Sequence, residues 1–166
     1  MAILPPRDPS AAVGALRALW DSKRGSREMP DRRDFKVEEL ARWLGRLNLL
    51  SLRDATARFD VFGTFNSRDL GLEMTGLMLD ALPPSVREIT EAGIERVRRE
   101  RGPVFETVRV QMQSRMRIYD RLLLPLANAD GRIEKILVLI DSPRDERPPQ
   151  PRWRARALPT VHAPAH

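Results

Sequence analysis

The stretch from Arg121 to Asp141 constrains the fold most, because it reads as two adjacent strands of one sheet. The turn-forming residues Asn128–Gly131 separate two apolar runs, and Asn, Asp and Gly are the residues that tight turns favour. The second run, Ile136–Ile140, is continuously apolar but far shorter than the about 20 residues needed to cross a bilayer. Such a strand is buried on both faces. The rest of the chain must therefore supply neighbouring strands and two covering layers.

Two further strands are predicted in the first half of the chain. Residues 47–52 are mostly apolar, and residues 58–64 alternate, since Phe59 and Val61 lie between polar or charged residues. A period of two is typical of a half-buried strand. We expect these strands to form a hairpin whose turn lies at residues 54–57.

The remaining strand is predicted at residues 104–112, where apolar and polar residues again alternate. We expect a loop of about three residues around Ser114, which would set Val108 opposite Asp120 and keep the apolar residues on one face. The five strands then complete an antiparallel sheet, and the chain belongs to the α+β class.

Helical segments are predicted around these strands. Ser10 or Asp8 can cap an amphipathic helix that ends near Arg24, and a short second helix is expected at residues 37–45. Residues 66–84 are irregular, with short helical turns. The clearest helix covers residues 85–101 and ends at a Gly-Pro pair. One face of this helix is marked by Val86, Ile89, Gly93 and Val97.

Length and charge favour one domain with extensions. The chain has 166 residues and a net charge of +6, and from residue 142 onward five arginines against two acidic residues account for +3 of that charge. The tail is also rich in proline and poor in apolar patterning. We therefore predict a flexible N-terminus at residues 1–9, a folded domain at 10–141 and a disordered Pro/Arg-rich tail at 142–166.

The order of two strands, a helical stretch, a long helix and three strands resembles the PAS fold. Specific motifs also resemble a proteobacterial family of single-domain PAS-like proteins over about residues 10–141. These motifs are Phe62–Thr64, Gly71–Gly76, the stretch 122–141, and an opening formed by residues 19–25, Met29, Pro30 and Arg32. The resemblance implies a PAS-like five-stranded antiparallel sheet with helices on one face. It also implies a sensory or interaction module, often with a small-molecule pocket, often dimeric, and without catalysis.

For such a pocket we predict a lining of apolar residues and one carboxylate. The predicted ligand-binding residues are Phe59, Val61, Met74, Val108, Met112, Asp120, Leu122 and Val138. Strand alternation directs Asp120 toward the core, where a buried carboxylate needs a partner. The alternative is that a local bulge turns Asp120 to solvent. The alternative for Met74 and Met112 is that they fill the hydrophobic core.

The residue inventory excludes several chemistries. The chain has no Cys, and its two histidines, His162 and His166, lie in the tail. The domain therefore has no His to bind haem and no thiol for a flavin adduct. Serine catalysis lacks its His partner, and no glycine-rich phosphate loop or metal motif is present. We expect no enzyme activity, no cofactor and no metal site.

Two kinds of partner are predicted. The stripe of Leu16, Leu19 and Trp20 on the N-terminal helix should pack on the outer face of the sheet and contribute to a homodimer interface. The second predicted protein partner is an unidentified signalling protein that would receive the signal. Alternatively, the chain is nucleic-acid-associated, and the tail segment Arg152–Arg156 makes weak, salt-sensitive contacts. No membrane span is predicted, and we expect a cytoplasmic protein.

Overall fold

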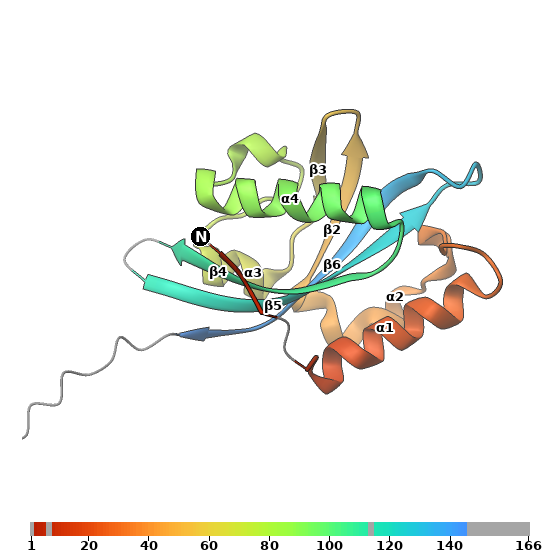
Figure 1. The fold of residues 1–166 in the computed structure, drawn as a ribbon, viewed down its shortest axis with the longest axis horizontal. Helices are drawn as coiled ribbons and strands as arrows, with labels where there is room; N and C mark the ends of the chain where they lie inside the picture. The colour runs from red at the N-terminus through yellow and green to blue at the C-terminus, as the bar shows by residue number, and fades with distance from the viewer. Residues whose placement is uncertain (1, 6–7, 113–114, 146–166) are drawn as a thin grey trace, which may run out of the picture.

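The computed structural model describes residues 2–5, 8–112 and 115–145 (Figure 1). Its strands are β1 (Ala2–Leu4), β2 (Leu47–Arg53), β3 (Thr56–Val61), β4 (Val104–Met112), β5 (Arg115–Ala127) and β6 (Ile133–Asp145). Its α-helices are α1 (Ala11–Arg24), α2 (Val37–Leu40), α3 (Thr64–Leu70) and α4 (Pro84–Glu100). Short 3-10 helices are η1 (Arg32–Asp34), η2 (Ala41–Arg46) and η3 (Leu79–Ala81). The α+β class is confirmed.

The strands form one antiparallel sheet in the order β1-β4-β5-β6-β2-β3. The hairpin expected from Asn128–Gly131 is present as β5 and β6, at the centre of this order. A sixth strand, β1, pairs with β4 within the segment for which the sequence suggested a flexible N-terminus. β6 continues to Asp145, which is beyond the predicted domain boundary. The rest of the predicted tail, from residue 146, lies outside the described residues.

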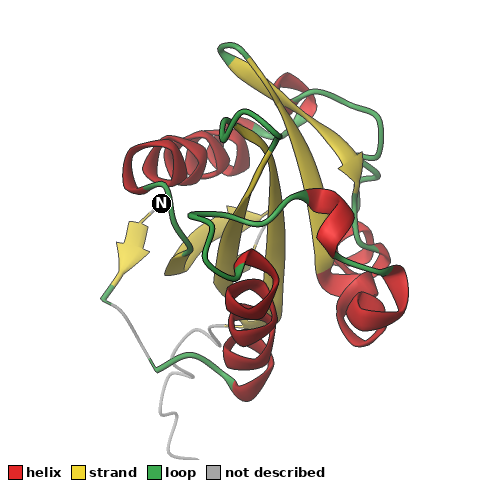
Figure 2. Cartoon of the chain, turned by 90° about the vertical axis from the view of Figure 1, so that its right-hand side faces the viewer, coloured by secondary structure: helices red, strands yellow, loops and turns green. Residues whose placement is uncertain are grey.

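Helices cover both faces of the sheet (Figure 2). α3 and α4 lie on one face and α1 lies on the other, as Figure 1 also shows. The central strand β6 supplies both cores, because Ile136 and Val138 pack toward α4 while Leu137 and Leu139 pack toward α1. The expectation that Ile136–Ile140 is buried on both sides holds for these four residues, and Ile140 is partly buried.

α1 is attached to the outer face of the sheet at both of its ends. Ser10 caps the helix by accepting a hydrogen bond from the Val13 amide, and its hydroxyl also donates to Asp141 on β6. Near the other end, the Trp20 indole N–H donates to the Pro125 carbonyl over 2.8 Å. This bond connects a buried aromatic ring to β5 near the C-terminal end of the strand.

Pro125 lies in β5, two residues before the strand ends at Ala127 and close to a register shift between Leu126 and Ala127. The pairing of β5 with β4 stops at Leu123, so β5 has no strand neighbour on that side at Pro125. An antiparallel residue directs its N–H and C=O to the same side. The missing proline N–H is therefore on the open side, where the Trp20 indole uses the carbonyl.

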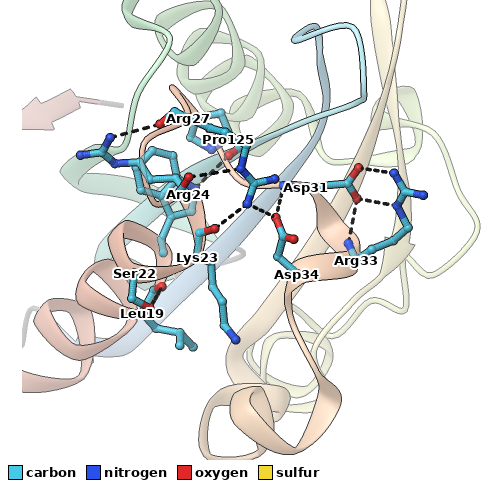
Figure 3. A network of polar contacts seen from close by, with 10 residues as sticks. Leu19, Ser22, Lys23, Arg24, Arg27, Asp31, Arg33, Asp34 and Pro125 are labelled. Carbon is cyan, nitrogen blue, oxygen red and sulfur yellow. Dashed lines mark hydrogen bonds and ion pairs between the residues drawn. The ribbon is translucent and has the colours of Figure 1, made fainter.

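The loop after α1 is held by charged side chains (Figure 3). Arg27 donates through Nη2 to the Lys23 carbonyl over 2.6 Å and to the Asp34 carboxylate over 2.8 Å. Asp34 also accepts from the Asp31 amide, and Asp31 pairs with Arg33. These contacts fix the chain where it passes from α1 to η1.

The register between β4 and β5 differs by one residue from the expected one. Thr107, and not Val108, lies opposite Asp120, and Val108 lies opposite Tyr119. Because side chains alternate along a strand, this shift places Asp120 on the opposite face from Val108. The difference matters for the site, because the predicted ligand residues divide between the two faces.

Burial of α1 gives a direct stability prediction. Leu16 is 0% exposed, so Leu16→Ala should lower the free energy of unfolding by about 2–5 kcal/mol through lost burial and the cavity that remains. The exposed neighbour Arg17 serves as the control. Arg17→Ala should change the free energy of unfolding by less than about 0.5 kcal/mol. Denaturant unfolding checks both values. Equal effects would contradict the packing of α1 on the sheet.

Candidate functional site

A cavity of about 80 Å³ lies between the sheet and the helices α3 and α4. The sheet contributes one wall and α3 and α4 contribute the other. The cavity is lined mainly by apolar side chains, with a small group of polar ones. Its lining residues are Asn48, Leu50, Phe59, Phe62, Asn66, Asp69, Leu70, Leu82, Val86, Ile89, Thr90, Ile94, Val108, Val110, Tyr119, Arg121, Leu123, Val138 and Ile140.

Two asparagines hold α3 against the sheet at one side of the cavity. The Asn66 side-chain amide donates to the Asn48 Oδ1 atom over 2.9 Å and to the Arg46 carbonyl over 3.1 Å. Asn48 Oδ1 also accepts from the Gly63 amide over 2.9 Å. A Cβ on Gly63 would lie 2.5 Å from the Gly45 carbonyl oxygen, so only glycine permits this close approach.

A charged pair closes the same side of the cavity. Asp69, near the end of α3, accepts from Arg46 over 2.7 Å, and Arg117 on β5 lies 3.9 Å from its other oxygen. The side chain of Asp69 is about one fifth exposed. Its negative charge is therefore compensated before any ligand enters.

A buried ion pair lies beneath α4. The Arg121 Nε atom donates to the Glu106 carboxylate over 2.6 Å, and its Nη2 atom donates to the Ile89 carbonyl over 2.6 Å. Burial lowers the pKa of Arg121, whereas the neighbouring Glu106 opposes this shift. The pair connects β4, β5 and α4 in a region where an unpaired charge would be very costly.

The close approach of this pair to α4 depends on Gly93. A Cβ at this position would lie 2.7 Å from Arg121 Nη2 and 3.2 Å from a carboxylate oxygen of Glu106. The helix face that the sequence marked by Gly93 thus covers the ion pair. What the sequence did not indicate is that this helix face also lines a cavity.

The predicted ligand residues are only partly brought together. Phe59, Val108 and Val138 line the cavity. Met74 is buried in the same apolar cluster as Phe59 but does not line the cavity, and Val61 is 46% exposed. The side chain of Met112 lies outside the described part of the structure.

Asp120 and Leu122 lie on the other face of the sheet, which corrects their placement in the pocket. Leu122 packs in the core beneath α1. Asp120 is buried, so it does not turn to solvent either, and it accepts a hydrogen bond from Thr107 over 2.6 Å. The one-residue register shift explains both positions.

The polar residues of the cavity wall were not predicted from the sequence. Asn66 lies in a stretch that we expected to be irregular, and it becomes a wall residue only because α3 folds back onto β2. Arg121 and Glu106 are far apart in sequence and are brought opposite each other by the β4–β5 register. Charged residues at buried positions of two predicted strands were the available signal.

A second polar cluster lies on the other face, where β2, β3 and β6 meet. Lys135 donates to Asp60 and to Ser51, each over 2.5 Å, and Ser51 also donates to Asp60. Burial raises the pKa of Asp60, but hydrogen bonds from Lys135, Ser51 and Arg58 outweigh burial and lower it to about 2. The ionised Asp60 carboxylate is thus held between Lys135, Ser51 and Arg58.

The predicted dimer stripe is largely occupied within the subunit. Leu16 and Trp20 are buried under α1 and Leu19 is partly buried against the same core. Leu16 and Trp20 are therefore not available to a second subunit while α1 is packed. The tail segment Arg152–Arg156, predicted to contact nucleic acid, lies outside the described residues.

Two searches of the described ranges give negative results. Within residues 2–5, 8–112 and 115–145, no helix is long and apolar enough to cross a bilayer. In the same ranges, no three His, Cys, Asp or Glu side chains lie together in a way that could hold a metal ion.

Comparisons with known proteins give one family match. Residues 9–140 match the family model described as PAS domain. A solved structure of an RNA-binding Light-Oxygen-Voltage receptor is similar, with 14% identity and a TM-score of 0.41 over 84% of this chain and 36% of that chain. This chain thus spans about a third of that receptor's length, and the likeness is too distant to bear on function. No curated protein matches the sequence.

The low pKa of Asp60 gives a pH-dependent stability prediction. Asp60→Asn should lower the free energy of unfolding at neutral pH by about 2 kcal/mol. The difference from wild type should narrow between about pH 4 and pH 2, because a carboxylate with a depressed folded pKa stabilises above its unfolded pKa and loses this effect on protonation. Urea unfolding across this pH range checks it. Asp130→Asn in the exposed β5–β6 turn is the control, and a pH-independent difference for Asp60→Asn would contradict the explanation.

The ion pair beneath α4 gives a second prediction, based on two helical glycines. Gly93→Ala should lower the free energy of unfolding by about 1–3 kcal/mol, because the methyl group overpacks the Arg121–Glu106 pair. Gly14→Ala in α1 is the matched control. No atom lies within 4 Å of the Cβ it would add, so it should stabilise by about 0.4–1 kcal/mol. Thermal unfolding measures both, and stabilisation by Gly93→Ala would contradict the packing.

Proposed function

Because the chain belongs to the PAS domain family, we propose that it is a noncatalytic sensory module that takes up a small molecule between its sheet and α4 and signals to a partner protein. PAS domains are sensory and signalling modules, and they commonly dimerise and mediate protein interactions. The observation that carries the proposal is the cavity of about 80 Å³ in a chain of this family. Its walls come from separate elements, with the sheet on one side and α3 and α4 on the other.

The polar groups around the cavity support binding over catalysis. Arg121 is paired with Glu106, and Asp69 is paired with Arg46. Both charged groups are thus already held in ion pairs, and neither is placed as an isolated acid or base toward the cavity. The cavity wall therefore suits a compound that is held and released unchanged.

The route of the signal is proposed from the helices that border the cavity. α4 contacts the cavity through Val86, Ile89, Thr90 and Ile94. α3 contacts it through Asn66, Asp69 and Leu70, and it is bonded to Asn48 of β2 through Asn66 and to Arg46 of η2 through Asp69. A ligand that displaces either helix would change the surface offered to a partner. We also propose that the protein acts as a cytoplasmic homodimer, with an interface that does not require Leu16 or Trp20.

A cavity-filling variant tests uptake of a ligand. Thermal-shift screening of small metabolites should find a compound that stabilises the wild-type chain, by about 2.7 kcal/mol at 100 times its Kd. Val108→Phe fills the cavity and should abolish this shift. Val61→Phe makes the same change at a half-exposed position outside the cavity, so this variant should still be stabilised by the compound.

Two outcomes would contradict this proposal. A stabilising compound whose effect survives Val108→Phe would bind elsewhere. If no compound stabilises the wild-type chain, while a partner protein is recovered with it from lysate, the chain is an adaptor and the sensory part is wrong.

A further inference from the structure

The polar groups of the cavity wall are already engaged within the protein. Thr90 donates its hydroxyl to the Val86 carbonyl over 2.8 Å, and Asn48 Oδ1 accepts two hydrogen bonds. Tyr119 also has an interaction within the protein. The Thr90 hydroxyl and the Asn48 Oδ1 atom are therefore already bonded before a ligand enters.

The charges of the wall are balanced in the same way. Arg121 is 5% exposed and bonded to Glu106, and Asp69 is paired with Arg46. A charged ligand would lose its water, and the two charged residues that line the cavity, Asp69 and Arg121, are already paired. Burying such an ion is strongly unfavourable. The cavity thus selects against anions and cations alike.

Asn66 Oδ1 is the exception. Asn66 is 3% exposed, and Oδ1 has no hydrogen-bond partner among the described residues. The orientation of the amide is set by its neighbours, because Nδ2 faces two acceptors, Asn48 Oδ1 and the Arg46 carbonyl. The wall therefore retains one unused acceptor, which costs free energy until a donor reaches it.

We propose that the ligand is a small neutral molecule with an apolar body and a single hydrogen-bond donor, which bonds Asn66 Oδ1. This inference rests on the proposed function and names the ligand class of the same cavity. The cavity volume limits the size of the ligand. One water molecule needs about 10–15 Å³ of such a cavity, so a volume of about 80 Å³ has room for on the order of six water-sized groups. A one-ring phenol or a short alcohol has this size and chemistry.

Four one-ring compounds test the proposal on the wild-type chain by isothermal titration calorimetry. Phenol should bind at least as tightly as toluene, whereas a wholly apolar cavity would prefer toluene by about tenfold or more, since an unbonded hydroxyl is costly to bury. Benzamide should bind at least about tenfold more tightly than benzoate, which has the same shape but carries a charge.

A variant assigns the effect to Asn66. Asn66→Leu removes the acceptor and should weaken phenol binding by about tenfold while changing toluene binding less than about twofold. Ser67→Ala, next to it on α3, is the matched control and should leave both affinities unchanged, because its hydroxyl bonds the exposed Glu73. If Asn66→Leu does not fold, the comparison of phenol with toluene on the wild-type chain still tests whether the cavity favours a hydrogen-bond donor.

Three calorimetric results with these compounds would overturn the inference. They are a preference of the wild-type chain for toluene over phenol, tighter binding of benzoate than of benzamide, and no binding of any of the four. The sensory proposal is judged separately by the metabolite screen. A charged hit in that screen that is lost in Val108→Phe would leave the sensory proposal standing and refute the ligand class.

Discussion

The fold depends on a central pair of strands, β5 and β6, that is apolar on both faces. Ile136 and Val138 need one cover and Leu137 and Leu139 need another, so the chain must provide helices on both sides of the sheet. α1 supplies the outer layer and α3 and α4 supply the inner one. The inner layer leaves a cavity against the sheet.

The cavity persists because polar contacts fix the distance between its walls. Arg121 reaches from the sheet to Glu106 and to the Ile89 carbonyl, and Asn66 holds α3 to β2. Polar groups that are buried must be bonded, so these contacts define where α3 and α4 can lie. An apolar interface could slide or collapse to fill the space, whereas a set of directed bonds resists this.

The candidate site was less predictable from sequence than the fold. Phe59, Val108 and Val138 were expected at the ligand pocket and do line the cavity, whereas Asp120 and Leu122 belong to the opposite core. The reason is the β4–β5 register, because a shift of one residue exchanges the faces of a whole strand. The alternation of apolar residues shows that a strand has two kinds of face, but it does not show which partner each residue meets.

The sequence by itself determined the strands, the long helices, the central hairpin and the double burial of β6, since these follow from local periodicity and turn chemistry. Its motifs also sufficed to indicate the PAS family. Only the tertiary structure decided the strand register, the addition of β1, the pairing of Glu106 with Arg121 and the position of Asn66 in the cavity wall. These features join residues that are distant in sequence. The packing of whole elements sets the geometry of such contacts, and local sequence patterns do not indicate it.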